Sequence, residues 1–149
     1  MTEGRPLMEY LTHDPIDRFT WYRQAADARD GASVEFLGLV RGTEGDQPIA
    51  ALSYETYEPM AERMIGKFVE EAEARWDLHQ VLVQHRVGTV AVGEIAVLIG
   101  IAASHREQAF EACRFLIDAI KRDVPIWKTA IGINGAIVEV ACAHGHQAQ

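Results

Sequence analysis

The sequence predicts a single α+β domain made of antiparallel hairpins and about three helices. Several short segments are rich in β-branched residues or alternate polar with apolar ones, as strands do, whereas longer segments repeat apolar residues at helical spacing. The 149 residues suit one domain, and the apolar pattern continues from about residue 18 to residue 140 without a linker or repeat. We therefore expect one domain over residues 1–140 and a disordered tail over residues 141–149.

The first third of the chain is expected to form a short helix and two paired strands. Residues 17–28 have the pattern of a short helix, and residues 32–40 are rich in β-branched and aromatic residues, which favours a strand. A polar loop with glycines over residues 42–48 leads to a second strand over residues 49–57. A hairpin is the simplest connection between these two strands.

The middle of the chain contains the most regular patterns. Apolar residues recur at steps of three, four or one over residues 59–76, which predicts a helix that buries one stripe. Residues 81–87 alternate as a strand does, and residues 88–93 are expected to turn. Residues 94–103 are apolar enough to be a strand covered on both faces, which predicts that this strand lies at the centre of the sheet.

The last third is expected to hold a helix followed by a hairpin. Residues 104–107 read Ser-His-Arg-Glu, the pattern of a capping box, so a helix should begin there and end before Pro125. Strands over residues 129–133 and 136–140 flank Asn134-Gly135, a pair typical of a two-residue type I′ turn.

The charge balance argues against a nucleic-acid partner. Lysine and arginine total 14 against 22 aspartate and glutamate residues, and the net charge of −8 should repel a polyphosphate backbone. An anionic substrate must then be held by a local cluster of basic side chains, so the positions of individual lysines and arginines are informative.

We expect a cytoplasmic protein that neither crosses nor binds a membrane. The longest apolar run, residues 95–103, is far shorter than the roughly 20 residues that span a bilayer, and the N-terminus lacks the order of a signal peptide. Cys113 and Cys142 have neither metal-ligand nor redox-motif spacing, which predicts no disulfide framework and no metal site.

His105 and Arg106 are candidates for an anion site. They stand in the first turn of the helix expected after the buried strand, where free backbone N–H groups and the positive end of the helix dipole already favour an anion. The alternative is an ordinary solvent-facing pair at a helix start.

Lys121 and Lys128 are candidates for catalysis. One lies at the end of the expected helix and the other begins the next strand, so both could reach one pocket. A partly desolvated lysine beside another cation has a lowered pKa, which suits acid/base chemistry or charge stabilisation near neutral pH. Alternatively, Lys121 only complements the helix dipole.

The length of the helix separates these two candidate sites. Sixteen helical residues place His105 roughly 24 Å from Lys121, too far for one small molecule to touch both within one chain. If both ends serve one substrate, a second copy of the chain must supply one of them, which predicts a homodimer. Arg41, between a strand and a glycine-bearing loop, is a further candidate for positioning a substrate.

Several short motifs occur in a fixed order between about residues 31 and 128. They are Gly31-Ala32, Phe36-x-Gly38-x-Val40-Arg41, Leu52-x-Tyr54-Glu55-x-Tyr57-x-x-Met60, His85-Arg86-Val87-Gly88, Ser104-His105-Arg106, Ala109-Phe110 and Pro125-Ile126-Trp127-Lys128. Together they resemble the large-subunit family of molybdopterin synthase, the MoaE family. The resemblance implies an α/β-hammerhead fold and a central dimer of large subunits. It also implies a small ubiquitin-like sulfur carrier at each end, forming a heterotetramer.

The resemblance also implies roles for individual residues. Lys121 and Lys128 become the catalytic pair, with Lys128 suited to acid/base work and Lys121 to positioning the carrier's C-terminal Gly-Gly thiocarboxylate. Thr129 and Ala130 follow Lys128 in the expected substrate site. Arg41, with the backbone of Leu39 and Val40, is expected to hold the precursor, and His105 and Arg106 of a neighbouring subunit are expected to bind its cyclic phosphate and pterin.

The implied reaction is a double sulfur transfer. The carrier thiocarboxylate attacks cyclic pyranopterin monophosphate twice, which opens the cyclic phosphate and leaves the molybdopterin dithiolene. The sulfur comes from the partner, so neither a catalytic cysteine, a metal nor a cofactor is expected. Lysines suit this chemistry because both the sulfur species and the phosphate leaving group are anionic.

Two departures from the family pattern favour a rival interpretation. The family typically has an acidic residue two places after the Trp-Lys, where this chain has Ala130, and the last hairpin is short and apolar, without the Arg-Trp that often precedes the final Val-Glu. The rival is a slow or non-catalytic paralogue that binds a ubiquitin-like carrier or regulates the true subunit.

Overall fold

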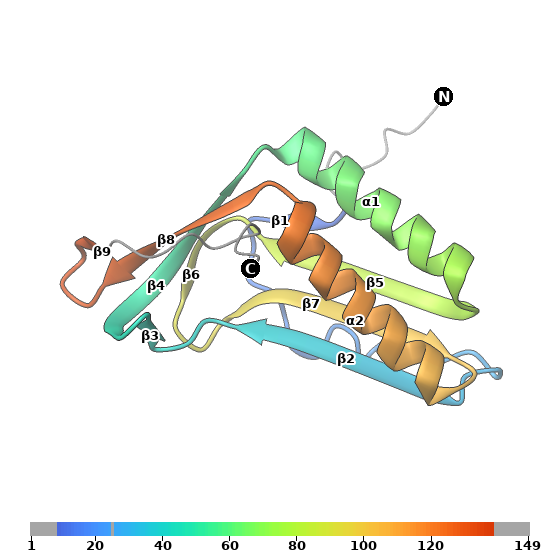
Figure 1. Ribbon diagram of the computed structural model, residues 1–149. Helices are drawn as coiled ribbons and strands as arrows, with labels where there is room; N and C mark the ends of the chain where they lie inside the picture. Colours follow the sequence, from blue (N-terminus) through green and yellow to red (C-terminus); the bar gives the residue numbers. More distant parts are fainter. Residues whose placement is uncertain (1–8, 25, 139–149) are drawn as a thin grey trace, which may run out of the picture.

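In the computed structural model, which describes residues 9–24 and 26–138, two sheets are joined end to end and two helices cover one of them (Figure 1). The first sheet has the strand order β1 (Leu11–Thr12), β5 (Leu78–Arg86), β7 (Ile95–Ala103) and β2 (Ala32–Leu39). β1 pairs with β5 in parallel, and β7 is antiparallel to both β5 and β2. Every residue of β7 is buried, which confirms that this strand lies inside the sheet.

The second sheet is built around one long strand. β4 (Gln47–Thr56) pairs with β3 (Thr43–Glu44), β6 (Gly88–Ala91) and β8 (Ile126–Gly132), and β8 in turn pairs with β9 (Ile137–Val138). All these pairings are antiparallel, and Tyr54 of β4 stands opposite Lys128 of β8. This register brings the start of β8 close to the end of the first sheet.

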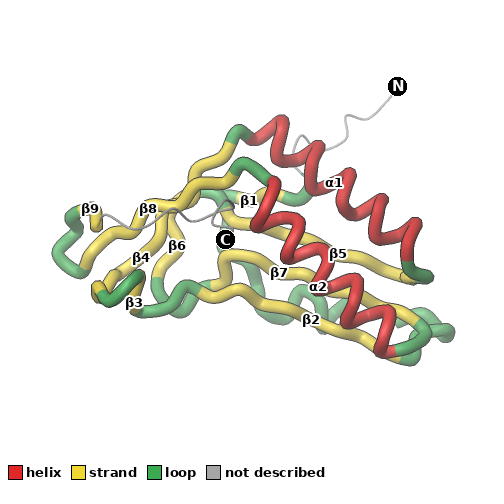
Figure 2. The backbone as a smooth tube through the Cα atoms, in the orientation of Figure 1, coloured by secondary structure: helices red, strands yellow, loops and turns green. Residues whose placement is uncertain are grey.

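The helices α1 (Glu58–Arg75) and α2 (Arg106–Asp123) lie side by side on one face of the first sheet (Figures 1 and 2). The apolar stripe of α1 is buried together with that of α2 and with alternate residues of β7, in the largest apolar cluster of the described chain. Both helices follow the helical spacing of apolar residues in the sequence. No helix in residues 9–24 and 26–138 is long and apolar enough to cross a membrane.

The other face of this sheet is covered by the segment before β2. Trp21 is 7% exposed and packs against Ile95, Leu98 and Ala102 of β7, and its ring Nε1 donates to Ser33 Oγ at 2.8 Å. Gly100 makes room for this ring, because a Cβ at that position would lie 2.2 Å from a ring carbon of Trp21. A residue without a side chain is therefore required here.

The α+β class is confirmed, but the helix expected over residues 17–28 is wrong. The described residues of this segment form hydrogen-bonded turns, so the described chain has two helices rather than about three. The Asp17 carboxylate accepts from the Phe19 backbone N–H at 2.9 Å and also pairs with Arg23. Such side-chain bonds compete with the helical pattern, and burial of Trp21 then fixes the irregular path.

The hairpin expected between the strands at residues 32–40 and 49–57 is also wrong. β2 pairs with β7 of the first sheet, whereas β4 pairs with β6 and β8 of the second. The intervening loop forms a smaller hairpin of its own, in which Thr43 pairs with Pro48 and Glu44 with Gln47. The expected turn over residues 88–93 likewise contains the short strand β6.

The turn at Asn134-Gly135 differs from the expected type I′ turn, which needs positive φ at both residues. Gly135 has a φ of 86°, but no described residue other than glycine has a positive φ. Gly132 N–H donates to Ala136 O at 2.7 Å, and Gly135 N–H donates to Gly132 O at 2.9 Å. The loop therefore has three residues and ends with a left-handed glycine, the next most common hairpin connection. The tail over residues 141–149 lies outside the described residues.

Candidate functional site

A small cavity brings Lys121 and Lys128 together where the two sheets meet. Lys121 lies in the last turn of α2, and Lys128 lies near the start of β8, which follows Pro125. The cavity has a volume of about 60 Å³, and its lining includes Leu39, Tyr54, His85, Ile117 and the two lysines. This volume suits a few water-sized groups or a narrow chain. A pterin ring system is too large for it.

The lysine amines have different surroundings. Lys128 Nζ lies 2.9 Å from Glu44 Oε1, and the two side chains are only 22% and 15% exposed. Burial lowers the pKa of Lys121, and the positive charges of Lys128 and Arg41 lower it further, whereas Glu44 partly opposes them. An anion that enters the cavity would therefore lie close to the amines of both lysines.

Tyr54 of β4 and His85 of β5 also line this cavity. Their rings meet edge to face with centroids 5.3 Å apart, and His85 Nδ1 lies 2.8 Å from the backbone oxygen of Arg86. Burial and the Glu44 carboxylate raise the pKa of Tyr54 to about 12, so its hydroxyl stays protonated at neutral pH. A protonated hydroxyl can donate a hydrogen bond to an anion in the cavity.

The segment expected to hold the precursor borders this cavity. Leu39 is 51% exposed and lines it, whereas Val40 is buried. The backbone N–H of Val40 donates to Glu94 O at 3.1 Å, and its carbonyl accepts from Gly93 N–H at 2.9 Å. Arg41 is exposed, and its charge affects Lys121.

Thr129 and Ala130 are not among the residues that line the cavity. Thr129 pairs with Ser53 and points to the opposite face of β8 from Lys128, because side chains alternate along a strand. Ala130 shares the face of Lys128 but has no exposed surface and packs in an apolar cluster with Leu52 and Val90.

His105 and Arg106 lie at the opposite end of α2, and both are exposed. The 18 residues of α2 form one continuous helix, so the separation of roughly 24 Å expected from helical rise holds within one chain. The structure thus brings Lys121, Lys128 and Leu39 together and leaves His105 and Arg106 apart from them.

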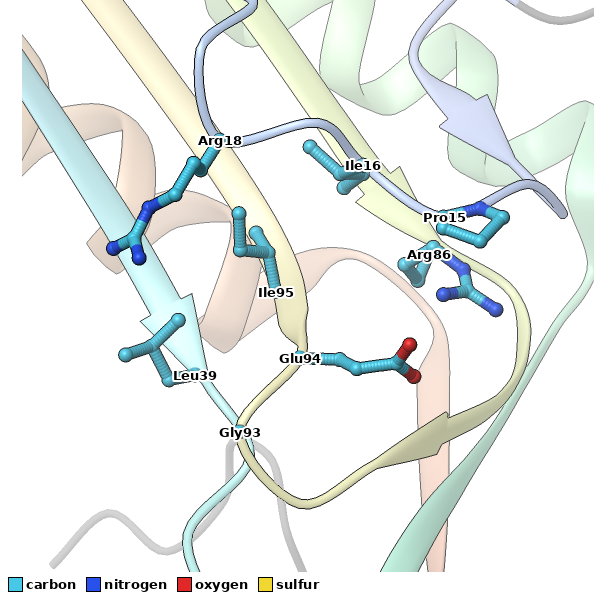
Figure 3. A pocket seen from close by; sticks show the side chains of 8 residues that line it. All are labelled: Pro15, Ile16, Arg18, Leu39, Arg86, Gly93, Glu94 and Ile95. Carbon is cyan, nitrogen blue, oxygen red and sulfur yellow. The ribbon is translucent and has the colours of Figure 1, made fainter.

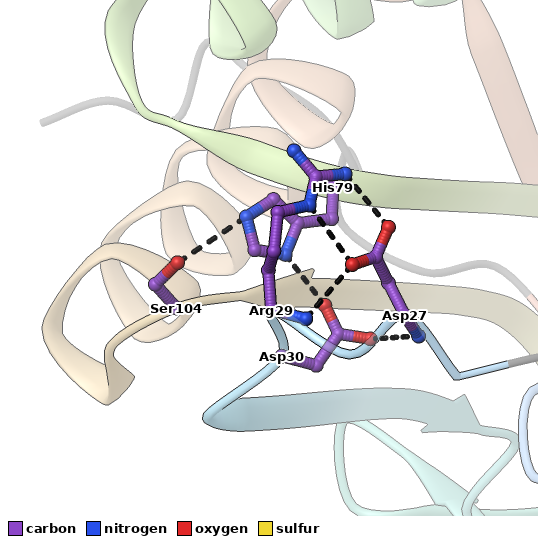
Figure 4. A network of polar contacts seen from close by, with 5 residues as sticks. All are labelled: Asp27, Arg29, Asp30, His79 and Ser104. Atoms are coloured by element: carbon purple, nitrogen blue, oxygen red, sulfur yellow. Dashed lines mark hydrogen bonds and ion pairs between the residues drawn. The ribbon is translucent and has the colours of Figure 1, made fainter.

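The expected capping box is absent, because Ser104 has another partner. His105 is the N-cap residue and makes no side-chain capping bond, while Ser104 Oγ lies 3.3 Å from His79 Nε2 (Figure 4). His79 Nδ1 lies 2.6 Å from Asp30 Oδ1, and its side chain is only 2% exposed. This network ties the β7–α2 corner to the segment before β2, and so fixes the position at which His105 and Arg106 emerge.

Asp27 completes the same network. Its carboxylate binds Arg29 at 2.7 Å, and its backbone N–H donates to Asp30 Oδ2 at 2.9 Å. Ligand atoms of Asp27, Asp30 and His79 lie within 4.8 Å of one another. The Asp27 backbone N–H and His79 hold the pKa of Asp30 below its usual range. These groups satisfy one another through hydrogen bonds.

A larger pocket of about 300 Å³ opens between the N-terminal segment and the end of the first sheet (Figure 3). Leu39 lines this pocket as well as the lysine cavity. Arg86, 5% exposed, donates to Thr89 O at 3.1 Å, and the Glu94 carboxylate points toward it in Figure 3. Glu94 itself accepts from Ala91 N–H at 2.8 Å.

Sequence reasoning missed the contribution of Glu44 to the site, and it assigned no role to Tyr54 or His85. Tyr54 and His85 stood in recognisable motifs, but only the strand register shows that Tyr54 faces Lys128. Glu44 carried no signal, because a single carboxylate in a polar loop is common.

Comparisons with known proteins agree on one family. A family model described as MoaE protein matches residues 11–123. The molybdopterin synthase catalytic subunit of Arabidopsis thaliana is 42% identical over 136 residues, which cover 91% of this chain and 69% of that protein. The corresponding subunit of Thermoplasma volcanium is 44% identical over 122 residues, covering 82% of this chain and 87% of that protein.

Solved structures give the same result. Molybdopterin synthase from Staphylococcus aureus superposes with a TM-score of 0.79 at 30% identity, covering 93% of this chain and 100% of that one. A complex of subunits 1 and 2 of molybdopterin-converting factor from Helicobacter pylori gives a TM-score of 0.62 at 26% identity, covering 74% and 71%. Because the family model spans most of the sequence and the relatives cover most of its length, the chain belongs to the MoaE family.

Proposed function

We propose that Lys121 and Lys128 are the catalytic residues with which this chain transfers sulfur. Its family and relatives identify it as a molybdopterin synthase catalytic subunit, a sulfurtransferase. The observation that carries the proposal is the narrow cavity in which both amines lie beside a protonated tyrosine.

The size of the cavity suggests what enters it. A cavity of about 60 Å³ suits a narrow group, such as an extended glycine main chain, better than a bulky side chain. We propose that a small ubiquitin-like carrier inserts its C-terminal Gly-Gly thiocarboxylate here. The Helicobacter pylori complex supports a partner of this kind, because it contains two subunits of molybdopterin-converting factor.

Each lysine has its own part in the reaction. Lys121 holds the thiocarboxylate by its charge, and Lys128 transfers protons as the sulfur attacks cyclic pyranopterin monophosphate and the cyclic phosphate opens. Each attack joins the carrier to the precursor through a thioester, which water then cleaves, so that the sulfur stays on the precursor and the carrier leaves as a carboxylate. Two carriers acting in turn supply the two sulfurs of the dithiolene. Negative charge develops on sulfur and on phosphate oxygen, and amines already in place stabilise it without further reorganisation.

The precursor lies outside the narrow cavity, near Leu39, Val40 and Arg41. We propose that His105 and Arg106 of a second large subunit bind its phosphate, since α2 holds these residues too far from Lys121 of their own chain. The working assembly is then a homodimer of large subunits with a carrier at each end.

One observation favours the rival function of a non-catalytic carrier-binding protein. Ala130 is completely buried in an apolar cluster, and it offers no carboxylate on the strand that carries Lys128. A protein of this kind would bind the carrier in the same cavity without turnover.

Single-turnover conversion of cyclic pyranopterin monophosphate with thiocarboxylated carrier separates the two functions. Wild type should form the dithiolene product, and Lys128→Ala should lose most of it while still binding the carrier. Lys67→Ala is the matched control, because Lys67 is an exposed lysine of α1 outside the cavity lining. Tight carrier binding without product from wild type would establish the rival function.

A further inference from the structure

Glu44 lies on the β3–β4 hairpin, far from α2 and β8 in sequence, yet its carboxylate contacts the amine of Lys128. Glu44 Oε1 and Lys128 Nζ are 2.9 Å apart. Both side chains are mostly shielded, at 15% and 22% exposed, so the interaction is less screened by solvent than a surface ion pair.

The hairpin fixes the position from which Glu44 reaches the cavity. Glu44 pairs with Gln47 and Thr43 with Pro48, and the turn between them begins at Gly45, whose φ of 59° favours glycine. Ile49 N–H also donates to Gly42 O at 3.0 Å, which closes the base of the loop. The carboxylate is therefore presented by a hydrogen-bonded element.

The Glu44 carboxylate acts on both lysines of the cavity. The charged groups that change the pKa of Lys121 are Lys128 on β8, Arg41 after β2 and Glu44 itself. Tyr54 of β4 and His85 of β5 also line the cavity. Glu44 raises the pKa of Lys121 against the effects of burial and of the other cations, and it also raises the pKa of Tyr54. Its charge thus acts on several groups of the site.

A carboxylate for Lys128 cannot come from the next residue on the same face of β8. That residue is Ala130, which has no carboxylate and is fully buried against Leu52 and Val90.

We propose that Glu44 is the positioning residue of Lys128, so that the β3–β4 hairpin completes the catalytic site. The inference rests on the proposed function of Lys128 as the acid/base group. A proton-transferring side chain is most effective when a third group fixes its direction, and Glu44 does this for the Lys128 amine. Glu44 itself touches no substrate in this scheme.

Turnover of Glu44→Gln tests this role directly. Glutamine keeps the size of the side chain but removes its charge, and a small displacement of Lys128 should lower kcat about tenfold to a hundredfold while KM for the carrier changes little. Glu44→Asp keeps the charge at a shorter reach and should recover part of the loss. Asp46→Asn, at an exposed position of the same hairpin, is the matched control and should behave as wild type.

The pH dependence of turnover is a measurement that a purely structural role of Glu44 would leave unchanged. Glu44 raises the pKa of Lys121, so its removal should shift the Lys121-dependent limb of the profile to lower pH in Glu44→Gln. Asp46→Asn should leave that limb in place.

Amine labelling tests the ion pair without any turnover. The Glu44 carboxylate covers the Lys128 amine at 2.9 Å, so an amine-reactive reagent should modify Lys128 severalfold faster in Glu44→Gln than in wild type, as measured by peptide mass spectrometry. Wild-type turnover in Glu44→Gln, with or without faster labelling, would overturn the positioning role. If the wild-type chain forms no product, that result alone contradicts the proposed function. Unchanged labelling of Lys128 in Glu44→Gln would separately overturn the role of Glu44.

Discussion

Lys121 and Lys128 share one cavity, but they have different neighbours. Lys128 faces the Glu44 carboxylate at 2.9 Å, whereas the pKa of Lys121 is lowered mainly by burial and then by the positive charge of Lys128. In the proposed function, an incoming thiocarboxylate adds negative charge beside Lys121 and favours its protonated form. Binding of the carrier tail and the protonation of this lysine are therefore linked.

This linkage predicts a pH dependence of carrier binding. In the proposed function the protonated form of Lys121 holds the anionic tail, so affinity should be full at low pH and fall as pH rises through the pKa of Lys121, which lies below the ordinary lysine value. Removing the charge of Lys128 relieves one cause of the lowered pKa. In Lys128→Gln the fall should therefore occur at higher pH than in wild type.

Calorimetric titration with a carrier ending in an ordinary Gly-Gly carboxylate measures this effect without catalysis. The midpoint of the fall in affinity should move upward in Lys128→Gln and stay in place in Lys67→Ala. The same midpoint in all three proteins would show that Lys121 does not hold the tail.

Among the single helices and strands, those with a strong local pattern in the sequence were predicted correctly. The helix expected over residues 59–76 is α1, the strand expected over residues 94–103 is β7, and a helix begins just after Ser104. Each has a long apolar repeat whose burial agrees with its local preference.

Elements that depend on distant contacts were not predictable in the same way. The segment over residues 17–28 has helical spacing, but burial of Trp21 against β7 and the side-chain bonds of Asp17 decide its path. The partner of β4 is likewise set by packing between sheets, which no local pattern reveals. The lysine pair was predicted because both members flank one proline, whereas Glu44 reaches the site only through a pairing between strands.

The contact between Trp21 and β7 predicts that Gly100→Ala destabilises the fold. A Cβ at residue 100 would lie 2.2 Å from the Trp21 ring, so the ring must shift, at a cost of about 1–3 kcal/mol of unfolding free energy. Urea denaturation measures this change. Gly66→Ala is the matched control, because its Cβ would meet Tyr10 at an ordinary 3.4 Å, and alanine in a helix should stabilise by up to about 1 kcal/mol. Equal stability of the two variants would contradict the packing argument.

At the scale of the whole molecule, α2 acts as a rigid spacer between two sets of cationic residues. Its C-terminal end carries Lys121 into the cavity, and its N-terminal end carries His105 and Arg106 at the surface, with the network of Asp30, His79 and Ser104 fixing that corner. In the proposed symmetric dimer, the N-terminal end of one copy would face the cavity of the other, and each dimer would contain two equivalent sites.

Mixed assemblies test this arrangement. In a dimer of one His105→Ala chain and one Lys128→Ala chain, one site carries both changes and the other carries neither. Mixed dimers isolated with two different affinity tags should therefore recover about half of wild-type turnover, although each variant alone is nearly inactive. A dimer of Lys121→Ala with Lys128→Ala should stay inactive, because these lysines belong to the same chain in every site and both sites are then damaged. No activity in the first dimer would show that His105 serves the lysines of its own chain. Activity in the second would show that one site draws Lys121 and Lys128 from different chains.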